Sequence, residues 1–237
     1  MDDTILKINN SDLKEMDNSI RLARYFSYNK LKDIVNNQLY FCNCELFDDD
    51  NERKRIDKGR YKNSKALDIS EKINKHLMNK CRAYVSCWTL FDSENVALWK
   101  IYDKNSTGAC VVTTVGKLKE QLEPNILIGN VLYDEKINIP LIDIEGVASN
   151  YLATEFVKIE PYFFEQEVRA VFFSRSSEAG ILKNIEFELL VDEVLLSPFA
   201  NNQNRQRTEE LLLKKIAKDK IKSSIVCESN KFIGYMQ

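Results

Sequence analysis

The sequence predicts an α+β protein: a single domain spanning residues 1–237, with a mixed, mostly antiparallel, twisted sheet and flanking helices. Its length of 237 residues suits one large domain that can bury a sizeable core. Runs rich in β-formers outnumber strand–helix–strand alternations, which favours α+β over α/β. No repeat, low-complexity tract or linker-like stretch divides the chain, so we expect one domain.

The elements of the N-terminal half are predicted from apolar periodicity. Strands are expected at residues 20–26, 38–42, 82–90, 108–114 and 126–133. Helices are expected after the N-cap Ser27, over residues 66–79, over residues 94–103 with Asp92 or Ser93 as cap, and around residues 117–122. Residues 45–65 carry mixed charge and have little to bury. They are predicted to be a charged surface loop, with a lid or substrate arm as the functional alternative.

The C-terminal half is predicted in the same way. We expect a helix over residues 142–157, a strand over 165–174 and, after a charged turn, an alternating strand over 185–190. A strand at 194–197, a loop with Pro198 and residues 201–204, a helix over 208–217 and a short strand at 224–227 complete the chain.

The composition excludes several kinds of chemistry. The formal net charge is −2, so no global charge excess attracts a nucleic acid, although a local basic groove stays open. His76 is the only histidine, which argues against a histidine-based triad and excludes a multi-histidine metal site. The seven glycines form neither a GxGxxG nor a GxxxxGK(S/T) motif, so Rossmann and P-loop phosphate sites are not expected.

The sequence also predicts a cytoplasmic protein. No window approaches the roughly 18 apolar residues of a membrane helix, and the N-terminus lacks a signal-peptide pattern. The six cysteines form no CxxC pair and lie mostly in apolar, strand-like runs, where free cysteine packs as a small hydrophobe. Reduced thiols fit this pattern better than a disulfide framework or a zinc site, and no metal is expected.

The stretch 162–173 holds the most unusual charges. Read as a strand, it places Glu165, Glu167 and Arg169 on one face before it becomes wholly apolar. Burying such charges without partners costs several kcal/mol, so we expect them at the end of the sheet, beside a cleft. The alternative is that Arg169 pairs with Glu165 or Glu167, or with charges elsewhere, on a solvated edge.

Seven short motifs, in order along nearly the whole chain, carry a family resemblance. They are Arg-Tyr-Phe-Ser ending at Ser27, Leu-Tyr-Phe ending at Phe41, Val-Ser-Cys-Trp-Thr ending at Thr89, Ala-Leu-Trp-Lys-Ile-Tyr ending at Tyr102, Gly-Ala-Cys-Val-Val ending at Val112, Glu-Gln-Glu-Val-Arg ending at Arg169 and Val-Asp-Glu-Val-Leu-Leu ending at Leu196. This order resembles a widespread bacterial family catalogued mainly as a domain of unknown function. That family usually carries Asn-Asp-Pro-Phe-Glu after its second strand. Residues 47–52 lack the proline, so no role of that loop is carried over.

An arginine on the first strand, a serine on a later strand and a Glu-x-Glu pair are similar to the arginine–serine–glutamate order of ADP-ribosyltransferases. This resemblance implies their fold and NAD as substrate, with Glu167 as the catalytic carboxylate and Glu165 orienting the acceptor. It also implies that Arg24 binds the NAD phosphate and that Ser86 braces the nicotinamide pocket. The implied cofactor-binding residues are Arg24, Ser86, Trp88, Thr89, Tyr102 and Arg169, with Arg21 as the alternative to Arg24.

Three functions follow as hypotheses. The first is an NAD-dependent ADP-ribosyltransferase that modifies a protein or nucleic-acid acceptor, or hydrolyses NAD, as a toxin or anti-phage defence effector. The second is a non-catalytic binding or sensing module of a bacterial defence or stress system, in which the charges of the 165–169 stretch form a structural network. The third is a Mg²⁺-dependent nuclease that uses Asp48, Asp49, Glu165 and Glu167. The oligomeric state stays open.

Overall fold

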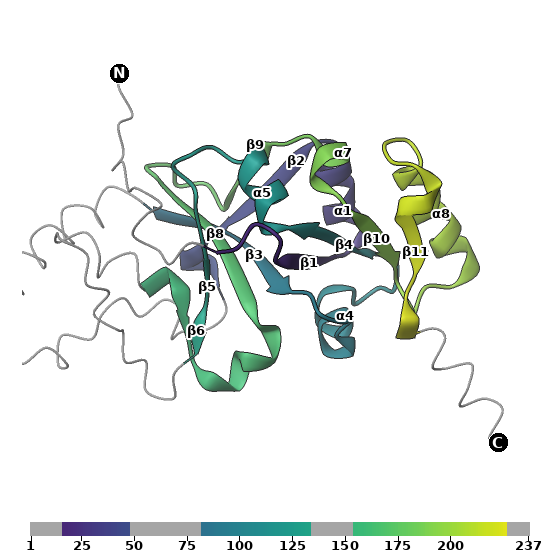
Figure 1. Cartoon of the computed structure of the whole chain (residues 1–237), viewed down its shortest axis with the longest axis horizontal. Helices are drawn as coiled ribbons and strands as arrows, with labels where there is room; N and C mark the ends of the chain where they lie inside the picture. The colour runs from purple at the N-terminus through teal and green to yellow at the C-terminus, as the bar shows by residue number, and fades with distance from the viewer. Residues whose placement is uncertain (1–15, 48–81, 134–153, 227–237) are drawn as a thin grey trace, which may run out of the picture. The chain divides into compact units, whose positions relative to one another are not determined.

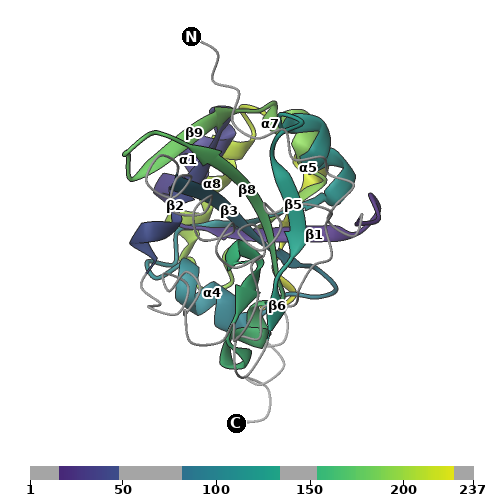
Figure 2. The same cartoon turned by 90° about the vertical axis from the view of Figure 1, so that its left-hand side faces the viewer.

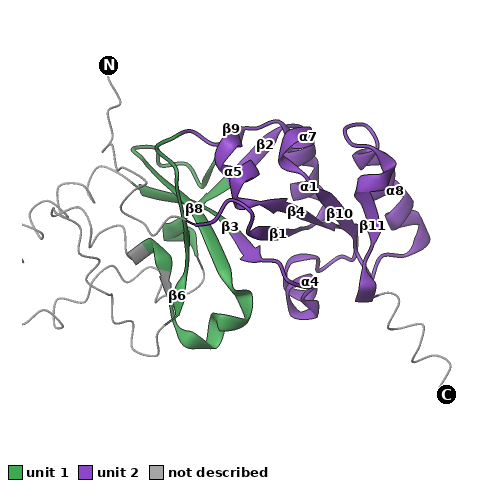
Figure 3. Ribbon diagram, viewed as in Figure 1, with its two compact units in different colours: residues 1–15, 41–87, 124–181 green, residues 16–40, 88–123, 182–237 purple. Residues whose placement is uncertain are grey.

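The computed structural model describes residues 16–47, 82–133 and 154–226. These residues form α+β structure with mostly antiparallel strand pairs, as expected. They divide into two compact units, each assembled from separate stretches of chain (Figure 3). Of the described residues, unit 1 contains 41–47, 82–87, 124–133 and 154–181. Unit 2 contains 16–40, 88–123 and 182–226.

The sheet of unit 2 is built on β4 (Ala109–Thr114), in which five of the six residues are buried. Strands β1 (Arg21–Phe26) and β10 (Glu193–Leu196) flank β4, both antiparallel to it. Beyond β10 lies β11 (Ile221–Ser223), which runs parallel to it. The last residues of β3 (Arg82–Leu90) pair antiparallel with β1 on its other side. A strand buried on both faces is expected to be β-branched and apolar, as β4 is.

Helices cover both faces of this sheet. They are α1 (Tyr28–Val35), α4 (Val96–Tyr102), α5 (Val115–Gln121), α7 (Phe187–Leu190) and α8 (Asn202–Leu212), followed by the 3₁₀ turn η5 (Lys218–Lys220). Figure 1 shows α4 on the opposite side of the sheet from α1, α5 and α7. Trp99 of α4 packs edge-on against Tyr25 at 4.9 Å between ring centroids, in a buried cluster with Ala23 and Val112. Trp99 is therefore a core residue.

Unit 1 is organised around β8 (Glu167–Ser174), whose first seven residues are buried. Strand β5 (Leu127–Asn130) runs antiparallel beside β8 (Figure 2), and β8 also pairs with β3. The end of β2 (Gln38–Asn43) pairs with β3, and β6 (Leu132–Tyr133) with β7 (Val157–Lys158). Short elements complete the unit: η2 (Cys44–Leu46), η3 (Thr154–Phe156), η4 (Glu160–Glu165) and the start of β9 (Gly180–Asn184).

Most of the expected strands lie within one or two residues of the observed ones, but the end of a helix or strand was often misplaced. Asn95, not Asp92 or Ser93, caps α4, because its side chain accepts hydrogen bonds from the backbone of the first turn. The asparagine run expected as a loop instead starts α8. Asn201 accepts from the Asn204 N–H at 2.8 Å, so the helix begins six residues early and ends at Leu212.

Two expected strands are wrong. Residues 187–190 form helix α7, because Phe187 and Leu190 are buried three positions apart, which is a helical spacing. The strand expected at 224–227 lies instead at β11. Strand β9 was missed within the expected charged turn. Residues 154–157, expected to end a helix, form η3 and the first residue of β7. The helix over 66–79 and most of the helix over 142–157 and of the loop over 45–65 lie outside the described residues.

Candidate functional site

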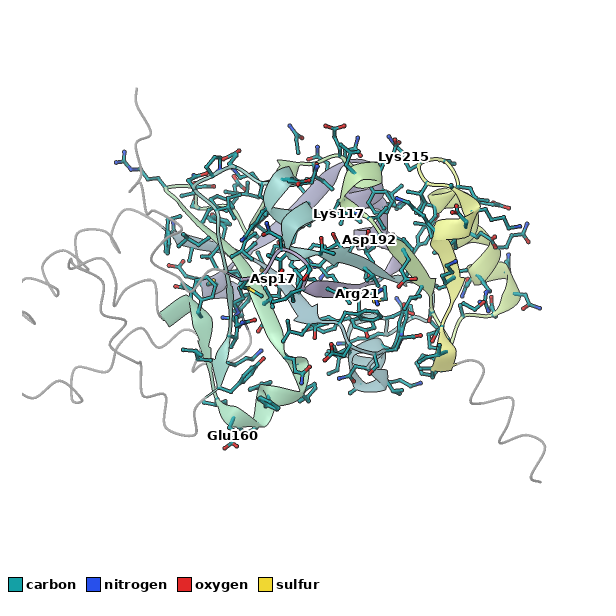
Figure 4. The ribbon with its side chains drawn as sticks, viewed as in Figure 1. Asp17, Arg21, Lys117, Glu160, Asp192 and Lys215 are labelled. Carbon is teal, nitrogen blue, oxygen red and sulfur yellow. The ribbon has the colours of Figure 1, made fainter. Side chains whose placement is uncertain are left out.

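The Glu-Gln-Glu stretch is a turn, not a continuous strand. Glu165 ends the 3₁₀ turn η4, and Gln166 adopts a left-handed conformation with φ 41° and ψ 53°. Only Glu167 begins β8. The prediction that Glu165 lies on the same strand as Glu167 is therefore wrong, because the left-handed residue Gln166 separates them. In Figure 4, Glu160 at the start of η4 points away from the ribbon. Glu165, at the end of η4, is buried.

The turn nevertheless brings the two glutamates to one cation. Lys158 Nζ lies 2.8 Å from Glu165 Oε2 and 3.6 Å from Glu167 Oε2. Arg169 donates from Nη2 to Glu167 Oε2 at 2.8 Å. With Glu155, these residues form what we call the charge cluster, and each of its five side chains is at least nine-tenths buried. The expectation of a solvated edge is therefore wrong. The pairing of Arg169 with a glutamate is confirmed.

Neighbouring groups hold the charge cluster in place. The Glu167 backbone N–H donates to the Tyr133 hydroxyl at 2.8 Å, and Arg169 Nη1 donates to the Glu155 carbonyl oxygen at 2.8 Å. Lys158 Nζ also lies 4.5 Å from the centre of the Tyr162 ring. Sequence reasoning missed Tyr133, Lys158 and Glu155. They stand 7 to 34 positions from the glutamates or arginine that they contact, so no local pattern could have identified them.

Two pKa values are shifted by this environment. Burial acts to raise the pKa of Glu167, but Arg169 and Lys158 oppose it, and the resulting pKa lies below its usual value. Glu167 is therefore ionised at neutral pH. Burial and the nearby carboxylates of Glu167 and Glu165 raise the pKa of Tyr133 to about 12, so its hydroxyl keeps its proton.

Two cysteines border the charge cluster. Burial and the adjacent Glu155 carboxylate raise the pKa of Cys44 well above its usual value. Cys44 belongs to a buried apolar cluster of unit 1, and Cys87, which is partly exposed, packs against that cluster. Cys42, Cys44, Cys87 and Cys110 form no disulfide within the described part of the chain.

Arg24 lies in unit 2, beside two aromatic rings. Its guanidinium carbon is 5.1 Å from the centre of the Phe26 ring and 5.8 Å from that of Trp88. Its terminal nitrogens lie 3.4 and 3.5 Å from the Tyr40 carbonyl oxygen, at the long end of the hydrogen-bonding range. Trp88 is 2% exposed.

Arg21 and Arg24 point to opposite faces of β1, as alternation predicts. Arg21, labelled in Figure 4, forms a 2.5 Å ion pair with Glu193, and its guanidinium lies 4.9 Å from the Phe91 ring centre. Phe91 belongs to the cluster on the α4 side of the sheet. Arg21 is exposed, whereas Arg24 is half-buried, where water and salt screen its attraction to an anion less, so Arg24 is the better candidate for an anion ligand.

Thr89 and Tyr102 are not brought to Arg24. Thr89 is paired with Ala23 across β1 and β3, so it shares the α4 side of the sheet with Ala23 rather than the face of Arg24. Tyr102 is 44% exposed on α4 itself. The predicted site residues also divide between the units. Ser86, Glu165, Glu167 and Arg169 belong to unit 1, and Arg24, Trp88, Thr89 and Tyr102 belong to unit 2.

The described ranges hold no group of three or more histidine, cysteine, aspartate or glutamate side chains arranged to bind a metal ion. Within the charge cluster, Lys158 pairs with Oε2 of Glu165 and Arg169 pairs with Oε2 of Glu167. Asp48, Asp49 and His76 lie outside the described residues. No helix within the described ranges is both long enough and apolar enough to span a bilayer.

No family model, curated protein or solved structure matches this chain. Its function must therefore be inferred from its own residues and their geometry.

Proposed function

We propose that the protein consumes NAD, as an enzyme of the ADP-ribosyltransferase type, with Glu167 as the catalytic carboxylate. One observation carries this proposal: Glu167 is an ionised carboxylate in a buried setting, fixed by Arg169, by Lys158 and, through its backbone, by Tyr133. A fixed anion in a low-dielectric site stabilises positive charge far better than one that must reorganise from water.

Cleavage of the nicotinamide–ribose bond develops that positive charge. The C–N bond breaks, its electron pair leaves with nicotinamide, and the ribose acquires oxocarbenium character that a carboxylate can stabilise. An acceptor hydroxyl, amine or water then forms the new bond to the ribose and gives up its proton. Glu165, joined to Glu167 through Lys158, is the group we assign to orienting the acceptor. None of these steps requires histidine.

Arg24 is the cation that we assign to the NAD pyrophosphate, because a guanidinium binds phosphate oxygens through two parallel N–H donors. The acceptor is a protein, a nucleic acid or water. In the cytoplasm, an enzyme that consumes NAD in this way would act as a toxin or as an anti-phage defence effector.

A competing function rests on a different observation. Glu167 is only 5% exposed, and Arg169 and Lys158 already bind it. Such a network stabilises a fold without any turnover, and the protein would then be a binding or sensing module. A change at Glu167 distinguishes the two functions, because it should abolish turnover in the enzyme and only lower the melting temperature of the binding module.

The test is nicotinamide release from NAD by the purified chain, with and without cell lysate. We expect release by the wild type, and loss of at least about a hundredfold in Glu167→Gln, the scale seen when one charge-stabilising group is removed. Glu160→Gln, on the exposed start of η4, is the matched control and should keep full activity. Circular dichroism and melting curves establish that each variant is folded.

Absence of release from a folded wild type, in both conditions, would overturn the proposal. Release that Glu167→Gln leaves unchanged would overturn the role of Glu167. A lowered melting temperature in Glu167→Gln, together with no turnover in any variant, is the result expected of the binding module.

A further inference from the structure

The two tryptophans of the chain differ in what their indole N–H groups bind. Trp99 Nε1 donates to Glu94 Oε2 at 2.9 Å. Trp88 Nε1 is buried and finds no hydrogen-bond acceptor among the described residues. A buried N–H without an acceptor is destabilising, so a native structure normally supplies an acceptor from water or a ligand.

A cation lies over the ring that carries this orphaned donor. The β1–β3 register pairs Leu22 with Leu90 and Ala23 with Thr89. Continued by one residue, it sets Arg24 opposite Trp88 on the same face of the sheet, in agreement with the 5.8 Å contact between them. A guanidinium that lies over a ring still presents its N–H donors in its own plane. The pair therefore combines a positive charge with an indole donor.

The start of α1, which follows directly on β1 in the chain, carries further donors. Ser27 follows Phe26, the second ring beneath Arg24. Ser27 occupies the N-cap of α1, yet its side chain makes no capping hydrogen bond, and the first turn carries no acidic residue. The backbone N–H groups of that turn are thus uncapped by any side chain of the helix, and a helix start of this kind attracts an anion.

We propose that Arg24, the Trp88 indole N–H and the uncapped start of α1 form a subsite for a phosphoryl oxyanion. In this subsite Trp88 acts as a hydrogen-bond donor and not as a stacking ring. The inference deepens the proposed function and rests on it for the identity of the ligand, which would be the NAD pyrophosphate. The competing explanation is a buried water that serves Trp88 alone.

The test uses inorganic pyrophosphate, with no NAD present. A ¹⁵N-labelled chain has two indole N–H resonances, and Trp99→Phe assigns them. We expect pyrophosphate to shift the Trp88 resonance in a saturable manner and to leave that of Trp99 in place. Binding to the folded state should also raise the melting temperature with pyrophosphate concentration.

Three variants identify the groups that bind. Arg24→Gln should weaken pyrophosphate binding by at least about tenfold, since bonds to a charged group contribute about 1.5–3 kcal/mol. Arg21→Gln, the same change on the opposite face of β1, is the matched control and should bind as the wild type does. Ser27→Asp places a carboxylate at the start of α1, so it should raise the melting temperature and compete with pyrophosphate.

The inference is overturned if millimolar pyrophosphate leaves the Trp88 resonance unmoved, or if Arg24→Gln and Arg21→Gln bind equally well. The outcome is separate from that of the nicotinamide assay. Pyrophosphate binding without NAD turnover would keep the subsite and reject the proposed function. Turnover that depends on Glu167, with no shift at Trp88, would reject the subsite alone.

Discussion

Arg169 and Glu167 stand two positions apart on β8 and form a 2.8 Å ion pair, with side-chain exposures of only 2% and 6%. Strand alternation places them on one face, and Lys158 approaches the same carboxylate from β7 at 3.6 Å. Removing two charges from water costs several kcal/mol per ion, and only close geometry with additional hydrogen bonds compensates for it. The bond from Arg169 to the Glu155 carbonyl is one of these.

Arg169→Met should therefore be costly, because it leaves the Glu167 carboxylate buried with less compensation. We expect the free energy of unfolding to fall by about 3–5 kcal/mol in urea titrations. Arg21→Met breaks the exposed pair with Glu193, and it should cost less than about 1 kcal/mol. The double variant Glu167→Gln with Arg169→Met should recover part of the loss. Equal costs for Arg169→Met and Arg21→Met would contradict this account.

Acid should weaken the fold through Glu167. Its pKa in the folded state lies below the value of about 4.5 usual for glutamate, so the folded protein binds this proton less readily than the unfolded chain. The stabilisation is fully present above the unfolded pKa and is lost as pH falls through the folded one. The unfolding free energy of wild type minus that of Glu167→Gln should therefore shrink as pH is lowered from 6 to about 3. A difference that is constant with pH would exclude this linkage.

Glu94 should anchor the last described residues to α4. Its carboxylate accepts from Trp99 Nε1 at 2.9 Å, from the Ser224 hydroxyl at 2.5 Å and from the Ile225 backbone N–H at 2.7 Å. Glu94→Ala should lower the unfolding free energy by about 1–3 kcal/mol, since the Trp99 donor is left buried and unsatisfied. It should also speed hydrogen exchange at the Ile225 amide.

The control for Glu94→Ala is Glu123→Ala. Glu123 has a 59% exposed side chain paired with Lys183, and its loss should cost less than about 1 kcal/mol. Unchanged exchange at Ile225 in Glu94→Ala would show that the anchor is not held by this carboxylate.

Gly108 should tolerate no side chain. A Cβ at this position would lie 1.7 Å from the Phe26 carbonyl oxygen, which is backbone and has little freedom to move. Gly108→Ala should lower the unfolding free energy by about 1–3 kcal/mol or more, measured by thermal or urea unfolding. Gly116→Ala is the comparison, because its nearest neighbour is the Asn18 side chain at 3.0 Å. A similar loss of unfolding free energy in both variants would mean that the β1 backbone shifts to make room for the methyl group, although β1 is paired with β4.

The sequence predicted the elements that have a clear period and failed where tertiary contacts decide. β3 and β4 are rich in β-formers and were placed to within one residue. The peptide 185–190 alternates in its sequence, yet it folds as α7 because Phe187 and Leu190 both reach the core. Alternation over six residues is too short to distinguish these two outcomes.

The candidate site was predicted in part. The pairing of Arg169 with a glutamate followed from a spacing of two on a strand, and the opposite directions of Arg21 and Arg24 followed from a spacing of three. Lys158 was not foreseen, since it reaches Glu165 across the turn η4. The indole N–H of Trp88 was not foreseen either, because a missing hydrogen bond leaves no trace in a sequence.

Each unit is assembled from stretches that are far apart in the chain, and this constrains how the protein is made. Unit 1 has no β8 until residue 174 has been synthesised, and unit 2 has no β11 until residue 223. β3 supplies residues 82–87 to one unit and 88–90 to the other. On the ribosome, β3 and β4 can pair with the earlier strand β1 once they emerge, but β3 still lacks β8 and β4 still lacks β10 until those later strands follow, a period in which chaperones protect such segments from aggregation. For the same reason, no contiguous fragment of the gene encodes either unit, so expression of half-length pieces should yield insoluble protein.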